Sequence, residues 1–467
     1  MPPETSLDVL HLLAQLLDGD LHLDRDVGQG QRRGLGAERV GLAQEFLDQE
    51  VEPPFSPNII ITPARANGLY AVGERVSWTI RQPLGMPGAR YTYEVRENNF
   101  TVLQSGALDL SSGAATLEGS LSRPGMISVV LRPVPPAGGP APNVTATVQP
   151  ILSAAAAVGI RDFRPGAPRP ADFRQFWDGK LAQLRAIPVN PKTAPVDSEN
   201  AKADMVTVTL DSVGSQVQGY LATPKGGSGK YPALVIYQYA GVYALQKETS
   251  ANRAAEGWLA FNVDSHDMPP DQATAPRNYG TLGNDSRDTA YFLNMYLRDV
   301  RAIEYIRSRP DWDGKTIVIM GTSMGGQQSY AVAGLVPDQI TAMLVNVPAG
   351  ANMVGDIYSQ RHGYPGWNAQ DARVVATAPY FDSMSFAPDV KATSLVALGF
   401  LDLTSPAYGT IASFDAITAP KEMVPMVDSD HNHITPQKQE AWYRRSREVL
   451  EQLRTTGSFT PNAGWDR

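Results

Sequence analysis

Short apolar runs alternate with segments of helical length from about residue 160 to the end of the chain. Continuous apolar runs of this kind, each followed by a helix, are typical of a mostly parallel sheet that is covered by helices on both faces. The pattern therefore predicts an α/β domain over residues 151–467. The strands that we expect in it are YPALVIYQY, GWLAFNVD, TIVIMG, AMLVNV, TSLVALGF and KEMVPMV, which begin at residues 231, 257, 316, 342, 393 and 421.

A different pattern, with a period of two, fills residues 55–150. Apolar and polar positions alternate in GERVSWTI, RYTYEVRE and GMISVVLRP, and clusters of Gly, Pro, Asn and Ser separate these runs. Short alternating strands at regular spacing indicate an antiparallel, immunoglobulin-like β-sandwich. The aromatic residues fall within the alternating runs, so we expect core packing, with sugar stacking as the alternative. They are Tyr70, Trp78, Tyr91 and Tyr93.

The first 54 residues follow neither pattern. A short leucine-rich run precedes DRDVGQGQRRGLGAERVG, which is charged, rich in glycine and without a helix or strand period. A segment of this composition has too little apolar surface to form a core. We therefore expect residues 1–54 to be peripheral or disordered. The Pro- and Gly-rich segment at 133–144 predicts an edge loop or a domain boundary.

Composition and charge narrow the classes of function. The chain has a net charge of −8 and no basic cluster, so we do not expect it to bind nucleic acid. The absence of cysteine excludes disulfides, thiolate metal ligands and cysteine nucleophiles. No apolar run reaches the roughly 18 residues of a membrane span, so we expect a soluble protein without membrane contact. The compartment stays open; we suspect export, although no signal peptide is evident.

One serine is bracketed by glycines in the motif GTSMG, at residues 321–325. The apolar run TIVIM before the motif predicts a buried strand, and GQQSYAVAGLV after it predicts a helix. A G-x-S-x-G turn between a strand and a helix is the context of a nucleophile elbow, where glycines permit a crowded turn. The helix N-terminus would then face charge that forms on a substrate. We predict that Ser323 is the nucleophile; a structural glycine-rich connection is the alternative.

A serine hydroxyl needs a general base and an orienting acid, which in this kind of domain follow in the order Ser, acid, His. His362 lies in a long loop and is expected to line a pocket or to be exposed. MVDSDHNHITP follows the last predicted strand and offers two candidate bases, His431 and His433. Asp402 comes just after the strand TSLVALGF, which makes it the candidate acid.

At these residues the chain resembles carbohydrate esterase family 7, the acetyl xylan esterases and cephalosporin C deacetylases of the α/β-hydrolase fold. The resemblance covers roughly residues 160–455. Several separated pieces in the family's order are more specific than the serine motif alone. The pieces are DFRQFWDGKLAQL, YQYAGV, YLRDVRAIEYIRSRPDWDGKTIVIMGTSMGG, APYFDSMSFAPDVKA, GFLDLTSP and APKEMVPMVDSDH.

The resemblance assigns roles to particular residues. It implies a catalytic triad of Ser323, Asp402 and His431, with His433 as a rival base. It also implies that the backbone N–H groups of Val242 and Met324 form the oxyanion hole. The fold that it implies is an α/β-hydrolase domain behind the β-sandwich.

The chain also departs from the family's pattern. Met324 replaces the Gln that usually follows the serine, which alters the pocket wall. SHDMPPD replaces an arginine- and glycine-rich turn, which puts the family's local packing and oligomeric contacts in question. In this loop we expect His266 and Asp267 to form a structural hydrogen-bonded pair. Asn432-His433 replaces the Glu-Gly that follows the catalytic histidine.

The function that we expect is therefore a serine esterase that removes short acyl groups, most of all acetyl, from carbohydrates or related alcohols. It would need no cofactor and no metal, and its partner would be an acylated carbohydrate or small ester; an oligomer is possible. Two alternatives stay open. One is a feruloyl, glucuronoyl, polyester or general carboxylesterase on the same fold, because fold does not fix substrate. The other is a carbohydrate-binding protein with a degenerate hydrolase domain.

Overall fold

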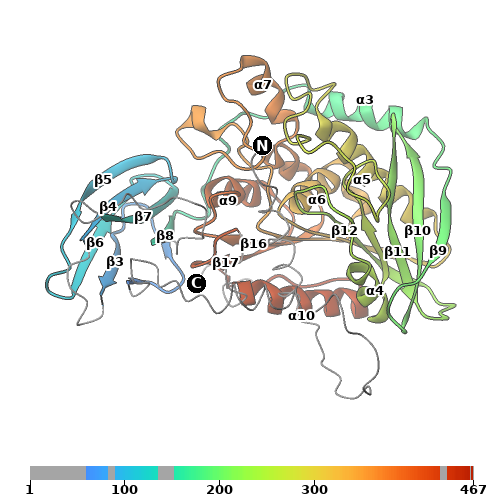
Figure 1. Ribbon diagram of the computed structural model, residues 1–467, viewed down its shortest axis with the longest axis horizontal. Helices are drawn as coiled ribbons and strands as arrows, with labels where there is room; N and C mark the ends of the chain where they lie inside the picture. The colour runs from blue at the N-terminus through green and yellow to red at the C-terminus, as the bar shows by residue number, and fades with distance from the viewer. Residues whose placement is uncertain (1–58, 83–89, 135–151, 432–438, 463, 466–467) are drawn as a thin grey trace, which may run out of the picture. The chain divides into compact units, whose positions relative to one another are not determined.

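The computed structural model describes residues 59–82, 90–134, 152–431, 439–462 and 464–465 (Figure 1). Ile59–Arg467 form one compact unit. Two of our expectations fall outside the described residues. They concern the N-terminal segment 1–54 and most of the Pro- and Gly-rich segment 133–144.

The first strands of the described chain build a β-sandwich. One sheet has the order β1-β3-β6 and the other the order β2-β8-β7-β4-β5. Neighbouring strands are antiparallel, except that β2 and β8 pair in parallel. β8 lies beyond residue 150, where the sequence pattern placed the end of this domain. The strands are β1 (Ile60–Pro63), β2 (Leu69–Tyr70), β3 (Val76–Arg81), β4 (Arg90–Glu97), β5 (Thr101–Leu108), β6 (Ala114–Gly119), β7 (Gly125–Val134) and β8 (Ser153–Val158).

The two sheets enclose a small apolar core. Every second residue of β3 is buried, which is the period of two that the sequence shows. Trp78 is completely buried, Tyr70 and Tyr91 are also buried, and Tyr93 packs against the same core. Core packing of these four aromatic residues is therefore confirmed.

A nine-stranded sheet forms the centre of the α/β region, with the order β17-β16-β15-β14-β12-β13-β11-β10-β9. Six neighbouring strands at one side of the sheet are parallel: β17, β16, β15, β14, β12 and β13. At the other side β11, β10 and β9 add an antiparallel extension. The six strands that the sequence predicts are confirmed as β12–β17. The strands are β9 (Lys192–Val196), β10 (Ala203–Ser212), β11 (Ser215–Pro224), β12 (Tyr231–Tyr237), β13 (Leu259–Val263), β14 (Trp312–Thr322), β15 (Ala342–Asn346), β16 (Thr393–Gly399) and β17 (Lys421–Met426).

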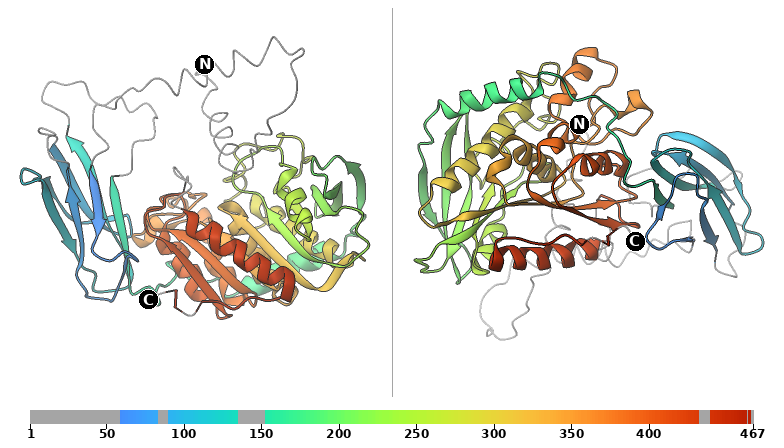
Figure 2. Two further views of the ribbon diagram at one scale, coloured as in Figure 1. Left: turned by 90° about the horizontal axis from the view of Figure 1, so that it is seen from below. Right: turned by 180° about the vertical axis from the view of Figure 1, so that it is seen from behind.

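Helices cover both faces of this sheet. Val235 and Ile319 point into the core that contains residues of α5 and α6, whereas Leu234 and Val318 point into the core under α10. Figure 1 shows α5 and α6 on one side of the sheet and α10 on the other. Seen from below, α10, in red, runs across the sheet (Figure 2, left). Burial on both faces explains why the parallel strands are continuously apolar.

The α-helices are α3 (Phe173–Arg185), α4 (Glu248–Ala255), α5 (Tyr291–Ser308), α6 (Met324–Leu335), α7 (Ala372–Thr377), α8 (Ser383–Phe386), α9 (Ala407–Ala416) and α10 (Glu440–Thr456). Short 3-10 helices occur at η1 (Pro337–Gln339), η2 (Gly355–Tyr358), η3 (Ala378–Tyr380) and η4 (Ala387–Asp389). In the described part of the chain, no helix combines the length and apolarity that a membrane crossing needs.

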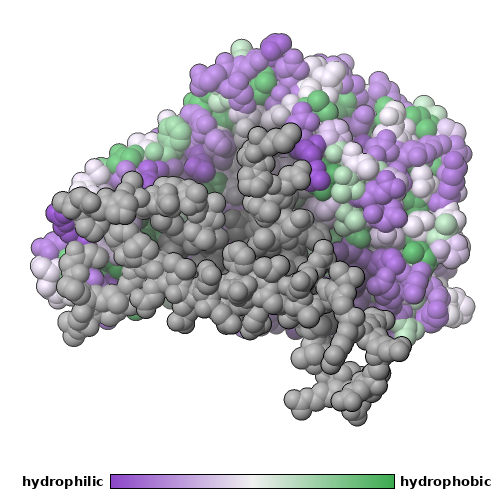
Figure 3. All heavy atoms as spheres, viewed as in Figure 1, coloured by the Kyte–Doolittle hydropathy of each residue, from purple (hydrophilic) through white to green (hydrophobic). Residues whose placement is uncertain are grey.

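The sandwich also contributes to the main apolar core. Leu69, Met126 and Ala155 belong to the same buried cluster as the residues of α5 and α6. The Arg361 N–H donates a hydrogen bond of 3.3 Å to the carbonyl of Asn98 in the sandwich. On the face in Figure 3, hydrophobic and hydrophilic residues are interspersed wherever described residues are visible.

Candidate active site

Ser323 lies at a sharp turn between β14 and α6, with φ of 54° and ψ of −119°. Positive φ is unfavourable for a residue with a Cβ, so the surrounding contacts must hold it. Its N–H donates to the carbonyl of Asn346 at 3.0 Å, and its carbonyl accepts from the N–H groups of Gly326 and Gln327. The strand, the turn and the helix therefore form the elbow that the sequence predicts.

The two outer glycines of the motif are required by close backbone approach. A Cβ on Gly321 would lie 2.2 Å from the carbonyl carbon of Gly325. A Cβ on Gly325 would lie 2.3 Å from the carbonyl oxygen of Tyr237, at the end of β12. Both distances are shorter than any real Cβ contact. Only glycine at these two positions lets the start of α6 pack against both β14 and β12.

A hydrogen-bonded relay connects Ser323 to a histidine and an aspartate. Ser323 Oγ lies 2.9 Å from His431 Nε2, and His431 Nδ1 lies 2.7 Å from Asp402 Oδ2. The three residues follow β14, β17 and β16, whose carboxyl ends meet at one edge of the sheet. The residues that the sequence proposes for the triad are therefore brought together by the parallel sheet.

Asp402 is completely buried, yet its carboxylate has a full set of partners. Its Oδ1 accepts hydrogen bonds from the N–H groups of Thr404 at 2.8 Å and Ser405 at 2.6 Å. Its Oδ2 is left for the Nδ1–H of His431. Because a carboxylate can only accept, this contact places the His431 proton on Nδ1 and leaves the Nε2 lone pair facing Ser323.

Met324 and Val242, the residues proposed for the oxyanion hole, come from α6 and from the loop after β12. Met324 is the first residue of α6, and the first N–H groups of a helix have no partner within the helix. Val242 is buried in its loop. The side chain of Gln328 donates to the carbonyls of Gln238, at 2.9 Å, and Met324, at 3.1 Å. This amide therefore joins the end of β12 to the start of α6.

The expected pair of His266 and Asp267 is wrong. His266 is completely buried, and its ring bonds to the hydroxyl of Tyr291 and to the carbonyl of Gly241, both at 2.9 Å. Asp267 is exposed and accepts from the N–H of Gln216 at 3.2 Å. The two adjacent side chains therefore have separate partners, one in the buried interior and one at the surface.

Of the other two candidate histidines, the structure describes His362 but not His433. His362 Nδ1 lies 2.9 Å from Asp356 Oδ2, and both side chains are about two-fifths exposed. His433 lies outside the described residues, so its position as a rival base stays a prediction.

Sequence reasoning missed three tyrosines around the site. The Gly241 N–H donates to Tyr279 Oη at 2.8 Å, Tyr279 Oη and Tyr364 Oη are 2.8 Å apart, and the Tyr364 hydroxyl donates to Met324 Sδ at 3.9 Å. Tyr291 bonds to His266. These tyrosines come from separate loops and one helix start, so no spacing in the sequence could have shown that they lie together.

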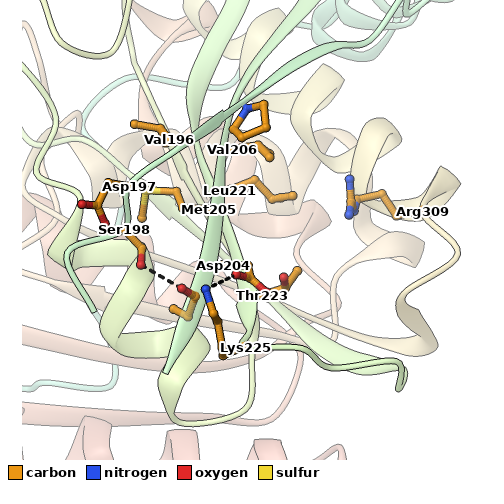
Figure 4. A pocket seen from close by; sticks show the side chains of 12 residues that line it. Val196, Asp197, Ser198, Asp204, Met205, Val206, Leu221, Thr223, Lys225 and Arg309 are labelled. Carbon is orange, nitrogen blue, oxygen red and sulfur yellow. Dashed lines mark hydrogen bonds and ion pairs between the residues drawn. The ribbon is translucent and has the colours of Figure 1, made fainter. Parts of the chain in front are cut away.

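Among the described residues, no three His, Asp or Glu side chains gather as metal ligands would. A surface cavity of about 380 Å³ lies at the β9–β11 edge of the sheet (Figure 4). Its lining includes Asp204, which pairs with Lys225 at 2.7 Å, but none of the relay residues.

Comparison with known proteins identifies the family. The family model for acetyl xylan esterase (AXE1) matches residues 156–448. The chain belongs to the acetyl xylan esterase family. It is a carboxylic ester hydrolase of the α/β-hydrolase fold, and the resemblance drawn from the sequence motifs is confirmed.

Individual relatives agree with this assignment. The acetyl esterase Axe7A of Xylanibacter ruminicola is 29% identical over 421 residues, which cover 85% of this chain and 91% of that protein. Residues 156–467 make up only about two thirds of this chain, so the match extends into the sandwich.

Solved structures share the fold of the α/β region. An acetyl xylan esterase from Paenibacillus sp. R4 has a TM-score of 0.53 at 25% identity, covering 62% of this chain and 98% of that one. Acetyl xylan esterase 1 from Thermoanaerobacterium sp. JW/SL YS485 has a TM-score of 0.53 at 19% identity, covering 63% and 97%.

Proposed function

We propose that this esterase of the acetyl xylan esterase family removes acetyl groups from acetylated carbohydrates through an acetyl-enzyme on Ser323. The observation that carries the proposal is the continuous relay from Ser323 Oγ through the His431 ring to the buried Asp402. A serine hydroxyl alone is a weak nucleophile, and a base within 2.9 Å supplies what it lacks.

In the first half-reaction Ser323 Oγ attacks the ester carbonyl while His431 Nε2 takes the hydroxyl proton. Asp402 holds the ring in the tautomer that has a free Nε2 and stabilises the imidazolium that forms. His431 then gives the proton to the leaving sugar oxygen, which departs as an alcohol. The acetyl group stays on Ser323 as an ester.

In the second half-reaction water repeats the attack. His431 takes a proton from water, the hydroxide adds to the acetyl carbonyl, and the Ser323 oxygen leaves with the proton that His431 returns. The N–H groups of Met324 and Val242 are proposed to bind the oxyanion in both half-reactions. Donors that are fixed before charge develops stabilise it without reorganisation.

Acetyl specificity rests on the relatives and on the residue beside the nucleophile. Axe7A is named an acetyl esterase, and the Paenibacillus enzyme an acetyl xylan esterase. We infer that the Met324 side chain forms one wall of the acyl pocket. It is completely buried and its sulfur accepts from the Tyr364 hydroxyl, so it cannot move aside easily for extra methylenes.

The experiment is a series of p-nitrophenyl esters from acetate to octanoate beside acetylated xylan, with Ser323→Ala as the inactive control. We expect acetate to be hydrolysed much faster than butyrate, acetate to be released from acetylated xylan, and the control to lose at least roughly a thousandfold in kcat. A flat profile to octanoate would instead indicate a general carboxylesterase.

A further inference from the structure

His266 lies just after β13, the strand next to β12, and faces the loop that carries Gly241 and Val242. It is completely buried, although it is not part of the relay of Ser323, His431 and Asp402. A buried imidazole in this place has to be explained by what its two nitrogens contact. One nitrogen contacts the carbonyl of Gly241 in the loop after β12, and the other contacts the hydroxyl of Tyr291 at the start of α5.

The hydrogen bonds of His266 fix its tautomer. Nε2 lies 2.9 Å from the Gly241 carbonyl, which can only accept, so Nε2 carries the proton. Nδ1 therefore accepts from the Tyr291 hydroxyl, 2.9 Å away. Burial lowers the pKa of His266 to about 4 and raises the pKa of Tyr291, so both groups are neutral at neutral pH.

The bond to Gly241 controls the direction of the next N–H. The Gly241 carbonyl and the Val242 N–H belong to one planar peptide group and point in opposite directions when it is trans. Holding the carbonyl therefore holds the N–H. A hydrogen bond to the carbonyl also polarises the peptide group and strengthens its N–H as a donor.

Gly241 is held on its other side as well. Its N–H donates to Tyr279 Oη at 2.8 Å, and its φ of 129° is a conformation that glycine adopts readily. Tyr279 continues to Tyr364, whose hydroxyl donates to Met324 Sδ. One hydrogen-bonded network thus reaches both the Gly241–Val242 peptide group and Met324, whose N–H groups are proposed as the oxyanion hole.

We propose that His266 is a positioning residue of the esterase reaction: its Nε2–H holds the Gly241 carbonyl and so keeps the Val242 N–H aimed at the oxyanion. This inference rests on the proposed function, because it needs an oxyanion to form at Ser323. Binding of the oxyanion occurs in the transition state and not in the ground state, so loss of the positioning bond lowers kcat and leaves KM nearly unchanged.

Three variants separate positioning from simple packing. His266→Phe fills the space without a donor, and we expect kcat to fall by roughly 10- to 100-fold, less than the loss on removing an oxyanion donor outright. His266→Gln can place its amide N–H where Nε2–H lies, and we expect kcat within about fivefold of the wild type. His266→Asn carries the same amide one methylene shorter, out of reach of the Gly241 carbonyl, and should behave like the Phe variant.

The assay measures kcat and KM with p-nitrophenyl acetate and the affinity for a trifluoromethyl ketone, which forms a tetrahedral oxyanion on the serine. The proposal predicts that this affinity falls in parallel with kcat/KM across the variants while KM stays within about twofold. Circular dichroism and Tm report folding. If His266→Phe does not fold, the comparison of the Gln and Asn variants decides.

Wild-type kcat in His266→Phe, or in His266→Asn, would overturn the proposal. So would equal losses in the Gln and Asn variants, or a loss of kcat without loss of ketone affinity. Failure of the underlying function looks different. In that case Ser323→Ala keeps its activity, whereas a wrong assignment of His266 leaves Ser323→Ala inactive.

Discussion

Replacing Gly325 by alanine should damage catalysis more than stability. The added Cβ would lie 2.3 Å from the carbonyl oxygen of Tyr237 and 3.3 Å from that of Gln238. Real Cβ contacts are essentially never shorter than 3.0 Å, so the start of α6 and the end of β12 must separate by roughly 0.7 Å or more. Both sides of the contact are backbone, which cannot rotate away as a side chain can.

That separation has two consequences of different size. Overpacking of a buried contact costs about 1–3 kcal/mol of unfolding free energy, which a domain of this size tolerates. The same shift moves the start of α6 away from the oxyanion loop after β12 and changes the position of Ser323 relative to His431. A misplacement of about 1 Å costs on the order of 100-fold in rate. We therefore expect Gly325→Ala to fold and to lose roughly 100-fold in kcat.

Gly179→Ala is the matched control. Gly179 lies in α3, and a Cβ there meets nothing within 4 Å. Alanine in a helix interior is more stable than glycine by about 0.5–1 kcal/mol, so this variant should gain stability and keep wild-type kcat. Urea denaturation and p-nitrophenyl acetate turnover measure both quantities. Wild-type kcat in Gly325→Ala, or an equal loss in Gly179→Ala, would refute the reasoning.

Two further predictions concern the histidines. His431→Ala should abolish the burst of p-nitrophenol from p-nitrophenyl acetate, whereas His433→Ala should keep the burst and change mainly KM for bulky sugars; the reverse result would exchange the two roles. His266 should make stability depend on pH. Burial lowers its pKa from 6.5 to about 4, so the unfolded chain takes up the proton first as the pH falls. Between pH 6.5 and 4 the wild type should lose on the order of 3 kcal/mol of unfolding free energy relative to His266→Gln, measured by urea denaturation at each pH, and parallel curves would contradict this.

The parallel strands could be predicted because burial on both faces leaves a continuous apolar run in the sequence. β10 and β11 could not be found in that way. In these two strands, partly exposed positions lie between the buried ones. Polar residues such as Thr207 and Gln218 occupy them, so the sequence shows no continuous apolar run. The sequence does not reveal β8 as a strand of the sandwich, because a Pro- and Gly-rich segment precedes it and a run of alanines carries little strand signal.

The relay residues could be predicted because each follows a recognisable strand, and the order of strands in the sheet brings the strand ends together. The hydrogen-bonded network around Gly241 could not be predicted from the sequence. Its tyrosines lie far apart in the sequence, and chain adjacency wrongly suggested a contact between His266 and Asp267. Sequence distance says little about contacts made by loops at the same edge of a sheet.

Covalent labelling tests the central claim, that Ser323 is the nucleophile, most directly. The enzyme is inactivated with an organophosphonate ester, digested, and the modified residue located by mass spectrometry, with Ser323→Ala treated in parallel. We predict that the label is on Ser323, in proportion to the activity lost, and that Ser323→Ala takes up none. Full inactivation with the label on another residue, or full activity with Ser323 labelled, would contradict the account.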